Sequence, residues 1–432
     1  MGTRVNSRSP AAVLSNEVFV VSAVERTELA PSFGGLGVSR ELVEELESEG
    51  IVSAFPIQAL TIPDALAGRD ICGKAKTGSG KTLAFGLPML ELIQQAQPRR
   101  PRGLVVVPTR ELAAQVAQTL EPLARLKGKR VLAVYGGTSV REQITTLATG
   151  VEVIVATPAR LIDLLERGTV HLDQLEILVI DEADEMADLG FLPQVQSIMR
   201  QVSAVHQTML FSATLDHRVQ VLVRNYMKDP IFHEVTSARM TVESSVHRFI
   251  EVQATDKARV TARIARSVAR TLVFVRTKRG CERVAADLRQ LSITTKAIHG
   301  DLDQTQREKA LRQFRSGRVP VLVATNVAAR GLDIEGIDVV VHYDLPEDST
   351  TYVHRSGRTA RAGEAGLVVT LVSNEQLETA GWIMKEAGLR MPVVRMYSND
   401  DRLDDLVSFH PGELPEPRKR GSTRNRRRAR LI

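Results

Sequence analysis

Short apolar segments rich in β-branched residues alternate along the chain with longer segments of helical periodicity. This alternation predicts strands joined by crossover helices, and therefore parallel sheets. In the first half, the expected strands lie in the segments GLVVVP, RVLAVYGG, VEVIVATP, EILVIDEAD and TMLFSAT. The second half repeats the rhythm in RTLVFVRT, TKAIHG, PVLVAT, IDVVVHYD and GLVVTLVS. The pattern predicts an α/β protein with two tandem sheets of the same kind.

The length of the chain supports a division into two domains. Its 432 residues, 43% of them apolar, exceed the roughly 250 to 300 at which a single core stops growing. The segment 234–248 is polar and rich in Ser and Thr, which is typical of a connection between domains. We expect an N-terminal extension over 1–30, a first domain over 31–235, a linker over 236–246, a second domain over 247–396 and a tail over 397–432.

The net charge of +6 is concentrated near the C-terminal end. Residues 418–430 hold eight basic residues and no acidic one, whereas the rest of the chain has 49 basic residues, that is 57 minus 8, against 51 acidic ones. Such a tail, basic from residue 418, is too polar to fold alone and suits phosphate backbones. A disordered, purely solubilising end is the alternative.

Cysteine usage and hydropathy exclude several classes of protein. Cys72 and Cys281 stand far apart and show no metal-ligand spacing, so neither a disulfide framework nor a zinc site is expected. No segment reaches the roughly 18 apolar residues of a membrane span, and no secretory signal is recognisable. We expect a cytoplasmic protein that does not contact a membrane.

The segment AKTGSGKT has the residue types of a loop that binds phosphates. Its glycines let backbone N–H groups approach a phosphate chain, Lys81 brings a positive charge to the outer phosphates, and Thr82 offers a hydroxyl to Mg²⁺. The strict pattern has Gly where this chain has Ala75. The residues expected to bind the nucleotide here are Ala75, Lys76, Thr77, Gly78, Ser79, Gly80, Lys81 and Thr82.

An acidic strand end about 100 residues later strengthens this interpretation. Asp181 and Glu182 directly follow the apolar run 177–180. In enzymes with such a loop, a carboxylate at the tip of a buried strand holds Mg²⁺, and the next acid can polarise the attacking water. A helix start favoured by the helix dipole would account for Glu185 and Asp188, but it leaves the apolar approach unexplained. We therefore assign Asp181 to Mg²⁺ and Glu182 to water.

The tetrad from Asp181 to Asp184, with the phosphate loop upstream, resembles the signature of the DEAD-box RNA helicases of superfamily 2, and the layout resembles the bacterial type. The resemblance runs from about residue 33 to 395, with the motifs in the family's order. It implies two tandem RecA-like domains, ATP and Mg²⁺ as cofactors, and RNA as partner. Phe33 and Gln58 resemble the Q motif, in which the Phe supports the site and the Gln reads the adenine edge.

Further motifs resemble the family's RNA contacts and its second half of the ATP site. The RNA contacts implied by the resemblance are Pro108, Thr109, Arg110, Gly136, Gly137, Thr157, Arg160, Arg276 and Thr325. Coupling between the two sites is implied for Asp184, Ser212, Thr214 and His354. The resemblance assigns Arg358 and Arg361 to the outer phosphates as arginine fingers, and Asp333 to the ribose or its neighbourhood.

The chain also departs from the family pattern. Ile51 stands where the family usually has an aromatic residue that stacks on adenine, so affinity or selectivity for adenine should be weaker and depend more on Gln58. Ala54 replaces the usual Pro of that loop, and Ala159 the usual Gly of the TPAR segment. None of these is a charged group, so we expect altered affinity and an intact reaction.

The resemblance implies an RNA-stimulated ATPase that closes two domains on RNA and separates strands locally, acting as a monomer. RNA should be preferred through 2′-hydroxyl contacts, with weak sequence preference because the contacts are to the backbone. The basic tail should bind RNA backbone as well. Two alternatives stay open: an ATP-gated RNA clamp with little unwinding, and a DNA helicase of the same superfamily.

Overall fold

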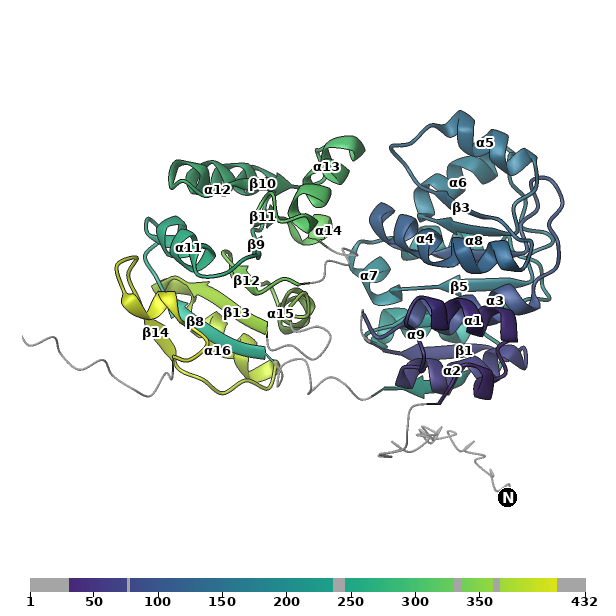
Figure 1. Ribbon diagram of the computed structural model, residues 1–432, viewed down its shortest axis with the longest axis horizontal. Coiled ribbons are helices and arrows are strands. Elements are labelled where there is room, and N and C mark those ends of the chain that lie inside the picture. The colour runs from purple at the N-terminus through teal and green to yellow at the C-terminus, as the bar shows by residue number, and fades with distance from the viewer. Residues whose placement is uncertain (1–30, 76–77, 236–244, 330–335, 360–365, 410–432) are drawn as a thin grey trace, which may run out of the picture. The chain divides into compact units, whose positions relative to one another are not determined.

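The computed structural model describes residues 31–75, 78–235, 245–329, 336–359 and 366–409 (Figure 1). The chain divides into two compact units, Met1–Thr236 and Ser237–Ile432. Within the described residues, each unit holds one parallel sheet of seven strands, flanked by helices. Each of the ten segments expected to contain a strand does contain one. The prediction of two tandem α/β sheets is therefore confirmed.

The sheet of the first unit has the spatial order β3-β4-β2-β5-β6-β1-β7. Its strands are β1 (Ile71–Lys74), β2 (Gly103–Val106), β3 (Val131–Val134), β4 (Val153–Ala156), β5 (Ile177–Ile180), β6 (Gln207–Ser212) and β7 (Ile231–Glu234). The helices are η1 (Gly34–Leu36), α1 (Arg40–Ser48), α2 (Pro56–Leu66), α3 (Lys81–Leu92), α4 (Arg110–Leu126), α5 (Val140–Ala148), α6 (Pro158–Glu166), α7 (Ala183–Asp188), α8 (Leu192–Met199) and α9 (His217–Tyr226).

Both faces of this sheet are buried, which is why its strands read as continuous apolar runs. Successive side chains of a strand point to opposite faces. In β2, Val105 therefore joins the core that α1 to α4 cover, whereas Leu104 and Val106 join the core beneath α6 to α9. Polar and charged residues occur mainly at the ends of the strands, where the loops begin.

The sheet of the second unit has the order β10-β11-β9-β12-β13-β8-β14, so its strands follow the same connectivity as those of the first. They are β8 (Ser245–Glu251), β9 (Thr271–Phe274), β10 (Thr295–Ile298), β11 (Val321–Ala324), β12 (Val339–His342), β13 (Gly366–Val372) and β14 (Val393–Arg395). The helices are α11 (Lys257–Arg266), α12 (Lys278–Gln290), α13 (Gln304–Arg315), α14 (Asn326–Ala329), α15 (Ser349–Ser356), η2 (Asn374–Gln376), α16 (Leu377–Glu386) and η3 (Asp401–Asp404).

The expected limits of the second domain were wrong at both ends. Ser245, placed in the linker, begins β8 and pairs with Gly366 of β13. Beyond residue 396, the chain continues on the second unit, and Leu403 and Leu406 are buried in its core. The sequence concealed this because two apolar anchors stand in an acidic segment, so the described residues 397–409 read as a tail.

Besides β1, which precedes the phosphate loop, three strands lie outside the ten expected segments, at one edge of each sheet or beside it. β7 and β14 are short edge strands with half-exposed side chains, and the alternating β8 contains Arg248. Such strands lack the run of apolar residues that marks a strand buried on both faces. Among the described residues, no helix is long and apolar enough to cross a membrane.

Candidate functional site

The strongest candidate site lies at the carboxyl ends of three adjacent strands, β5, β6 and β1. In open α/β sheets, ligands bind at this edge. The phosphate loop follows β1, Asp181 and Glu182 follow β5, and Ser212 ends β6. The Ala75 N–H donates to the backbone oxygen of Ser212 at 2.9 Å, which ties the start of the loop to the neighbouring strand.

The described part of the phosphate loop has the backbone that glycine permits. Gly78 and Gly80 have φ of 81° and 84°, in the left-handed region that side chains disfavour. Gly80 immediately precedes α3, whose first N–H groups have no partner within the helix and form, with the helix dipole, a site for anions. Lys76 and Thr77 lie outside the described residues.

Lys81, the first residue of α3, forms a buried ion cluster with both acids that follow β5. Its Nζ lies 2.9 Å from Glu182 Oε1 and 3.6 Å from Asp181 Oδ1, and its side chain is only 5% exposed. Burial alone would lower the pKa of Lys81, but the two carboxylates outweigh it and raise that pKa. The ammonium has three donors, and the contact with Glu182 at 2.9 Å engages one of them, so others remain for an anionic ligand.

The two acids differ in their surroundings. Burial raises the pKa of Asp181, although the Lys81 ammonium opposes this, and Asp181 Oδ1 accepts a hydrogen bond from the Glu182 N–H at 2.9 Å. Glu182 has φ of 54° and ψ of 51°, a left-handed conformation that costs about 1–2 kcal/mol for a residue with a side chain. Strain of this kind gathers at functional sites. The Glu182 carboxylate lies against Lys81.

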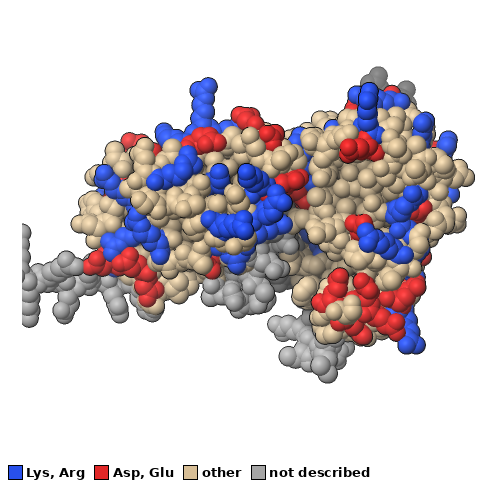
Figure 2. All heavy atoms as spheres, turned by 45° about the horizontal axis from the view of Figure 1, so that its top comes forward, with Lys and Arg blue, Asp and Glu red and all other residues tan. Residues whose placement is uncertain are grey.

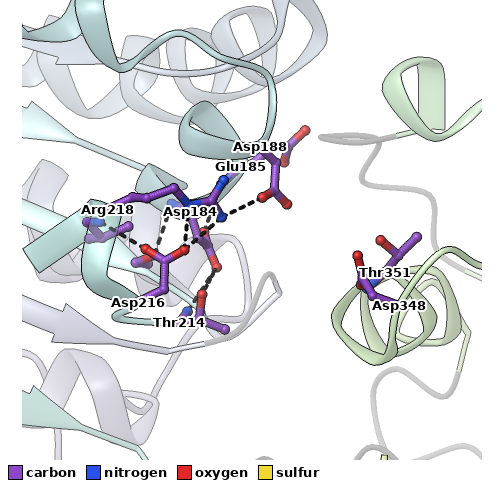
Figure 3. A network of polar contacts seen from close by, with 10 residues as sticks. Asp184, Glu185, Asp188, Thr214, Asp216, Arg218, Asp348 and Thr351 are labelled. Atoms are coloured by element: carbon purple, nitrogen blue, oxygen red, sulfur yellow. Dashed lines mark hydrogen bonds and ion pairs between the residues drawn. The ribbon is translucent and has the colours of Figure 1, made fainter. Parts of the chain in front are cut away.

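Asp184 connects the acids after β5 to the end of β6 (Figure 3). Its Oδ2 accepts hydrogen bonds from the Thr214 N–H at 2.9 Å and the Thr214 hydroxyl at 3.1 Å, and its own N–H donates to Ser212 Oγ at 3.1 Å. The structure thus brings together three of the four residues expected to couple the sites. The fourth, His354, lies on α15 in the second unit.

Glu185 and Asp188 have surroundings that the helix-start interpretation did not predict. Asp188 forms an ion pair with Arg218 of α9 at 2.8 Å, and Arg218 also pairs with Asp216 (Figure 3). Glu185 is 6% exposed, so it is not a solvated acid. These contacts fix the short helix α7 against α9.

Of the two residues that resemble the Q motif, Gln58 lies at the phosphate loop and Phe33 lies in the core of the first unit. Gln58 is buried beside the phosphate loop, where its Nε2 donates to the Gly80 oxygen at 2.9 Å and its Oε1 accepts from the Phe55 N–H at 2.7 Å. Phe33 packs inside the core of the first unit at 1% exposure. Ile51 is half-buried against that same core.

The RNA-binding residues expected in the first unit gather at the ends of β3, β4 and β2, three adjacent strands on the other side of β5. Thr109 immediately precedes α4, and its side chain accepts a hydrogen bond from the Leu112 N–H. Gly136 lies close to Arg110, since a Cβ on Gly136 would lie 3.2 Å from Arg110 Nη2. The full set at this edge is Pro108, Thr109, Arg110, Gly136, Gly137, Thr157 and Arg160.

Arg160 holds two of these loops together. Its Nη1 donates to Gln143 Oε1 at 2.8 Å and lies 3.4 Å from the Thr138 oxygen, so α6 is linked to the segment that follows the double glycine. Gly137 has φ of 91°, in keeping with a turn that a side chain would strain. The carboxyl edge of the first sheet therefore divides into a phosphate-loop half and a second half of small, hydroxyl and Arg residues.

In the second unit, the expected residues also follow strand ends. Thr325 follows β11 and is buried, whereas Arg276 follows β9, is exposed, and donates its N–H to Asp344 Oδ2 at 2.8 Å. Arg358, two residues beyond the end of α15, is 7% exposed. Asp333 and Arg361 lie outside the described residues.

Arg355, on α15 three residues before Arg358, contacts other elements of the second unit. Its Nε donates to Asn326 Oδ1 at 2.6 Å, its Nη1 donates to the Asp344 oxygen at 2.9 Å, and its guanidinium lies over the Phe274 ring. It therefore links α15 to α14 and to the end of β12. Arg355 and Arg358 are both buried, and it is the contacts with Asn326 and Asp344 that give Arg355 a structural role.

A parallel sheet with a phosphate loop after β1 and carboxylates after β5 defines a RecA-like nucleotide-binding unit, and a second sheet of the same connectivity follows it. Residues 55–222 match the DEAD/DEAH box helicase family, and residues 256–363 match the helicase conserved C-terminal domain. A DEAD-box ATP-dependent RNA helicase CshA of Geobacillus kaustophilus is 39% identical over 86% of this chain and 80% of its own length. The chain belongs to the DEAD-box helicase family.

Other relatives agree with this assignment. A helicase of the same description from Bacillus cereus is 41% identical over 79% of this chain, and the matched region is 65% of that relative, a little under two thirds. Among solved structures, Saccharomyces cerevisiae Dbp5 bound to RNA and ADP BeF3 aligns with a TM-score of 0.79 at 28% identity, covering 87% of this chain and 98% of that one. The fold is that of two tandem RecA-like domains.

Proposed function

We propose that this chain is an RNA-stimulated ATPase that couples ATP binding and hydrolysis to closure of its two units on RNA and to local, largely sequence-independent unwinding. The observation that carries the proposal is the buried cluster of Lys81, Asp181 and Glu182 beside a glycine loop at a helix start. Removing an ammonium and two carboxylates from water costs free energy of desolvation. A function therefore explains this cluster better than a gain in stability does.

The cluster supplies the groups that phosphoryl transfer to water needs. Lys81 binds the outer phosphates. The phosphates then replace Glu182 as the anionic partner of the Lys81 ammonium. Glu182 is then free to accept a hydrogen bond from the attacking water and to orient it. Arg358, and Arg361 with it, stabilises the charge that develops on the transferred group, a contribution of about 10³- to 10⁵-fold in related enzymes.

The same edge suits Mg²⁺, which prefers oxygen ligands. Thr82 follows Lys81 with a partly exposed side chain, and Asp181 supplies a carboxylate at the strand end. The described residues contain no group of three or more His, Cys, Asp or Glu able to hold a metal by themselves. We therefore assign Thr82 and Asp181 to a Mg²⁺ that enters with the nucleotide and neutralises phosphate charge.

RNA is proposed to bind at the strand ends of both units. Hydroxyls, backbone N–H groups at helix starts and Arg charges suit a sugar-phosphate backbone, and none of them reads a base. Lys and Arg side chains gather on the second unit, at the left of Figure 2, which favours an anionic partner. The basic segment 418–430, outside the described residues, is proposed to add sequence-independent affinity for RNA to a protein that acts as a monomer in the cytoplasm.

Hydrolysis tests the proposal most directly. Glu182→Gln should keep ATP binding but lower RNA-stimulated phosphate release by about 10²- to 10⁴-fold, the range for loss of a general base. Glu166→Gln, an exposed acid at the end of α6, is the matched control and should change neither. Equal turnover by Glu182→Gln and by wild type would refute the assigned chemistry.

Two comparisons separate the proposal from its alternatives. Stimulation of phosphate release by DNA as strongly as by RNA would instead favour a DNA helicase. ATP-dependent retention of RNA, with slow phosphate release and no separation of a short duplex, would favour a clamp. Release of a strand from a short RNA duplex at a rate that follows ATP turnover is the outcome expected here.

A further inference from the structure

β7 is the outermost strand of the first sheet, and one of its edges is open. Among the described residues, β7 pairs only with β1, in parallel. The Ile231 N–H donates to the Asp70 oxygen, so alternate residues of β7, beginning with Ile231, direct their backbone groups at β1. The N–H and C=O groups of Phe232 and Glu234 therefore point away from β1, with the geometry to pair with one further strand.

The side chains along this edge are unevenly covered. Ile231 packs against the core that α1 to α4 cover, and His233 Nε2 lies 2.9 Å from Asp64 Oδ2 of α2. Phe232 lies on the other face, because it is in register with Cys72, which belongs to the core beneath α6 to α9. Phe232 is 49% exposed. An apolar ring therefore stands in water beside the outward-pointing backbone groups.

An edge of this kind favours unwanted association. A strand with unpaired backbone groups and an apolar side chain is a template for pairing with another chain, so native proteins cover it or charge it. β7 contains a single acid, Glu234, whose Oε1 lies 2.7 Å from Lys74 Nζ of the neighbouring β1. That ion pair offsets the charge that would repel a further strand. The edge is therefore exposed in a form that native sheets usually cover.

The chain contains an apolar segment to which the sequence motifs assign no role. Residues 17–24, outside the described residues, have the sequence EVFVVSAV. Six of these eight residues are apolar and four of them are Val, a composition that favours strands. The apolar residues occupy both alternating positions, as in strands that are covered on both faces. A segment of this composition left in water is itself prone to aggregate.

The segment joins the first unit close to β7. The Pro31 oxygen, where the described chain begins, accepts a hydrogen bond from the Ala54 N–H. η1 follows at once and packs on α2, and α2 packs on β7. Neighbouring elements pack about 10 Å apart, and the six residues 25–30 span up to about 20 Å. The connection is therefore long enough to bring residues 17–24 to the open edge.

We propose that residues 17–24 add to the first sheet as an eighth strand, which pairs with the open edge of β7 and covers Phe232. The pairing supplies hydrogen-bond partners for the outward-pointing groups of Phe232 and Glu234. It also places an apolar side chain about 5 Å from that of Phe232, the distance between paired residues of adjacent strands. One contact thus removes both apolar surfaces from water. It involves none of the residues assigned to the nucleotide or to RNA.

Amide hydrogen exchange on the full chain, resolved residue by residue, tests the pairing. The double variant Val20→Asp/Val21→Asp places a charge on each face of the added strand, where burial would be costly. Its Phe232 amide should exchange at least about 10-fold faster than that of wild type, because the hydrogen bond that protects it is lost. Val13→Asp/Leu14→Asp makes the same change outside the segment and should exchange as wild type does. Equal exchange of the Phe232 amide in wild type and Val20→Asp/Val21→Asp would overturn the proposal.

Photocrosslinking from position 232 identifies the occupant of the edge. Phe232 is replaced by p-benzoylphenylalanine, which keeps an aromatic ring, and the crosslinked peptides are identified by mass spectrometry. We expect a crosslink to residues 17–24 of the same chain. A mixture of isotopically labelled and unlabelled chains distinguishes this from a contact between two copies. A crosslink between copies, or no crosslink to residues 17–24, would refute the assigned occupant.

Proteolysis tests the same contact from the other partner. Chymotrypsin cleaves after Phe19 only when the segment is released from the sheet, so cleavage follows the population of the open state. Phe232→Asp should speed cleavage after Phe19 at least about fivefold by adding a repelling charge to the edge. Val205→Asp changes another exposed apolar residue of the first unit, 87% exposed, and should leave cleavage unchanged. Equal rates in wild type and Phe232→Asp would contradict the proposed contact.

Discussion

The two units place a lysine at the same point of the same fold and surround it differently. Lys81 begins α3 after β1, and Lys257 begins α11 after β8, the strand that occupies the same place in the second sheet. Both side chains are buried and directed at strand ends. Lys81 meets the carboxylates that follow β5, whereas the Lys257 Nζ donates to the backbone oxygens of Tyr343 at 2.8 Å and Leu371 at 3.3 Å.

The difference lies in the residues around the lysine. In the first unit, Asp181 and Glu182 follow β5, and these carboxylates raise the pKa of Lys81. In the second unit, Tyr343 follows the equivalent β12, and burial lowers the pKa of Lys257. The loop before Lys257 contains no glycine, so its backbone cannot form the same cradle for phosphates. Fold position alone therefore does not make a nucleotide site.

The largest expected effect separates the two lysines by activity. Lys81→Met should lower RNA-stimulated phosphate release by at least about 10²-fold, the scale for loss of one group that stabilises the transition state. Lys257→Met should stay within a few-fold of wild type, because Lys257 donates to two backbone carbonyls of its own unit and lies over the Tyr343 ring. The steady-state rate of phosphate release measures the activity of both variants. Comparable losses of activity in the two variants would contradict the prediction that only Lys81 serves catalysis.

The second expected effect reverses the contrast in stability. Lys257→Met should leave the Tyr343 and Leu371 carbonyls without their donor, at a cost of about 1–3 kcal/mol in the free energy of unfolding. Trp382, the single tryptophan of the chain, lies on α16, so urea unfolding followed by its fluorescence reports on the second unit. Lys296→Met, at an exposed position of β10, is the control and should shift the urea midpoint little.

The third expected effect is a pH dependence confined to the second unit. His342 ends β12 within a buried group, with Arg355, His247, Tyr352 and Thr370 against it, and burial holds the pKa of His342 well below 6.5. Below pH 6.5, the unfolded chain takes up a proton that the folded chain refuses. Stability should therefore fall as pH falls, by up to about 1.4 kcal/mol per pH unit.

Trp382 fluorescence during urea unfolding at pH 7.0, 6.0 and 5.5 measures this dependence. His342→Gln removes the titrating group and should flatten the pH profile, even if its stability at pH 7 is lower. A profile equally steep in His342→Gln and wild type would assign the effect to other groups.

The smallest expected effect contrasts two left-handed residues with side chains. Ser292 follows α12 with φ of 61° and is exposed. Ser292→Gly should stabilise the second unit by roughly 0.5–1 kcal/mol, because it relieves a conformation that glycine adopts freely. Activity should not change. Glu182→Gly should relieve the same backbone strain but abolish phosphate release. This result would show that the strained residue is needed for activity at position 182 and is not needed at position 292.

The sequence predicted what depends on residue order and could not predict what depends on packing. The apolar runs from β2 to β6 and from β9 to β13 were found because strands buried on both faces carry a continuous signal. The phosphate loop, Asp181 and Glu182 were found because residue types and spacing define them. Leu403 and Leu406 were missed, since single apolar residues in an acidic segment reveal no partner until the fold supplies one.

Within the site, the same limit applied to Arg355. Arg355 shares a regular spacing with Arg358, and only its contacts with Asn326 and Asp344 separate it.

Ser212, at the carboxyl end of β6, accepts hydrogen bonds from both the phosphate loop and α7. Local opening at Ser212 would therefore affect both segments. Its backbone oxygen accepts from the Ala75 N–H at the start of the phosphate loop, and its hydroxyl accepts from the Asp184 N–H. Amide hydrogens exchange with solvent when such bonds open. The amides of Ala75 and Asp184, about a hundred residues apart in sequence, should therefore exchange at similar rates, and a nucleotide that steadies the phosphate loop should slow both together.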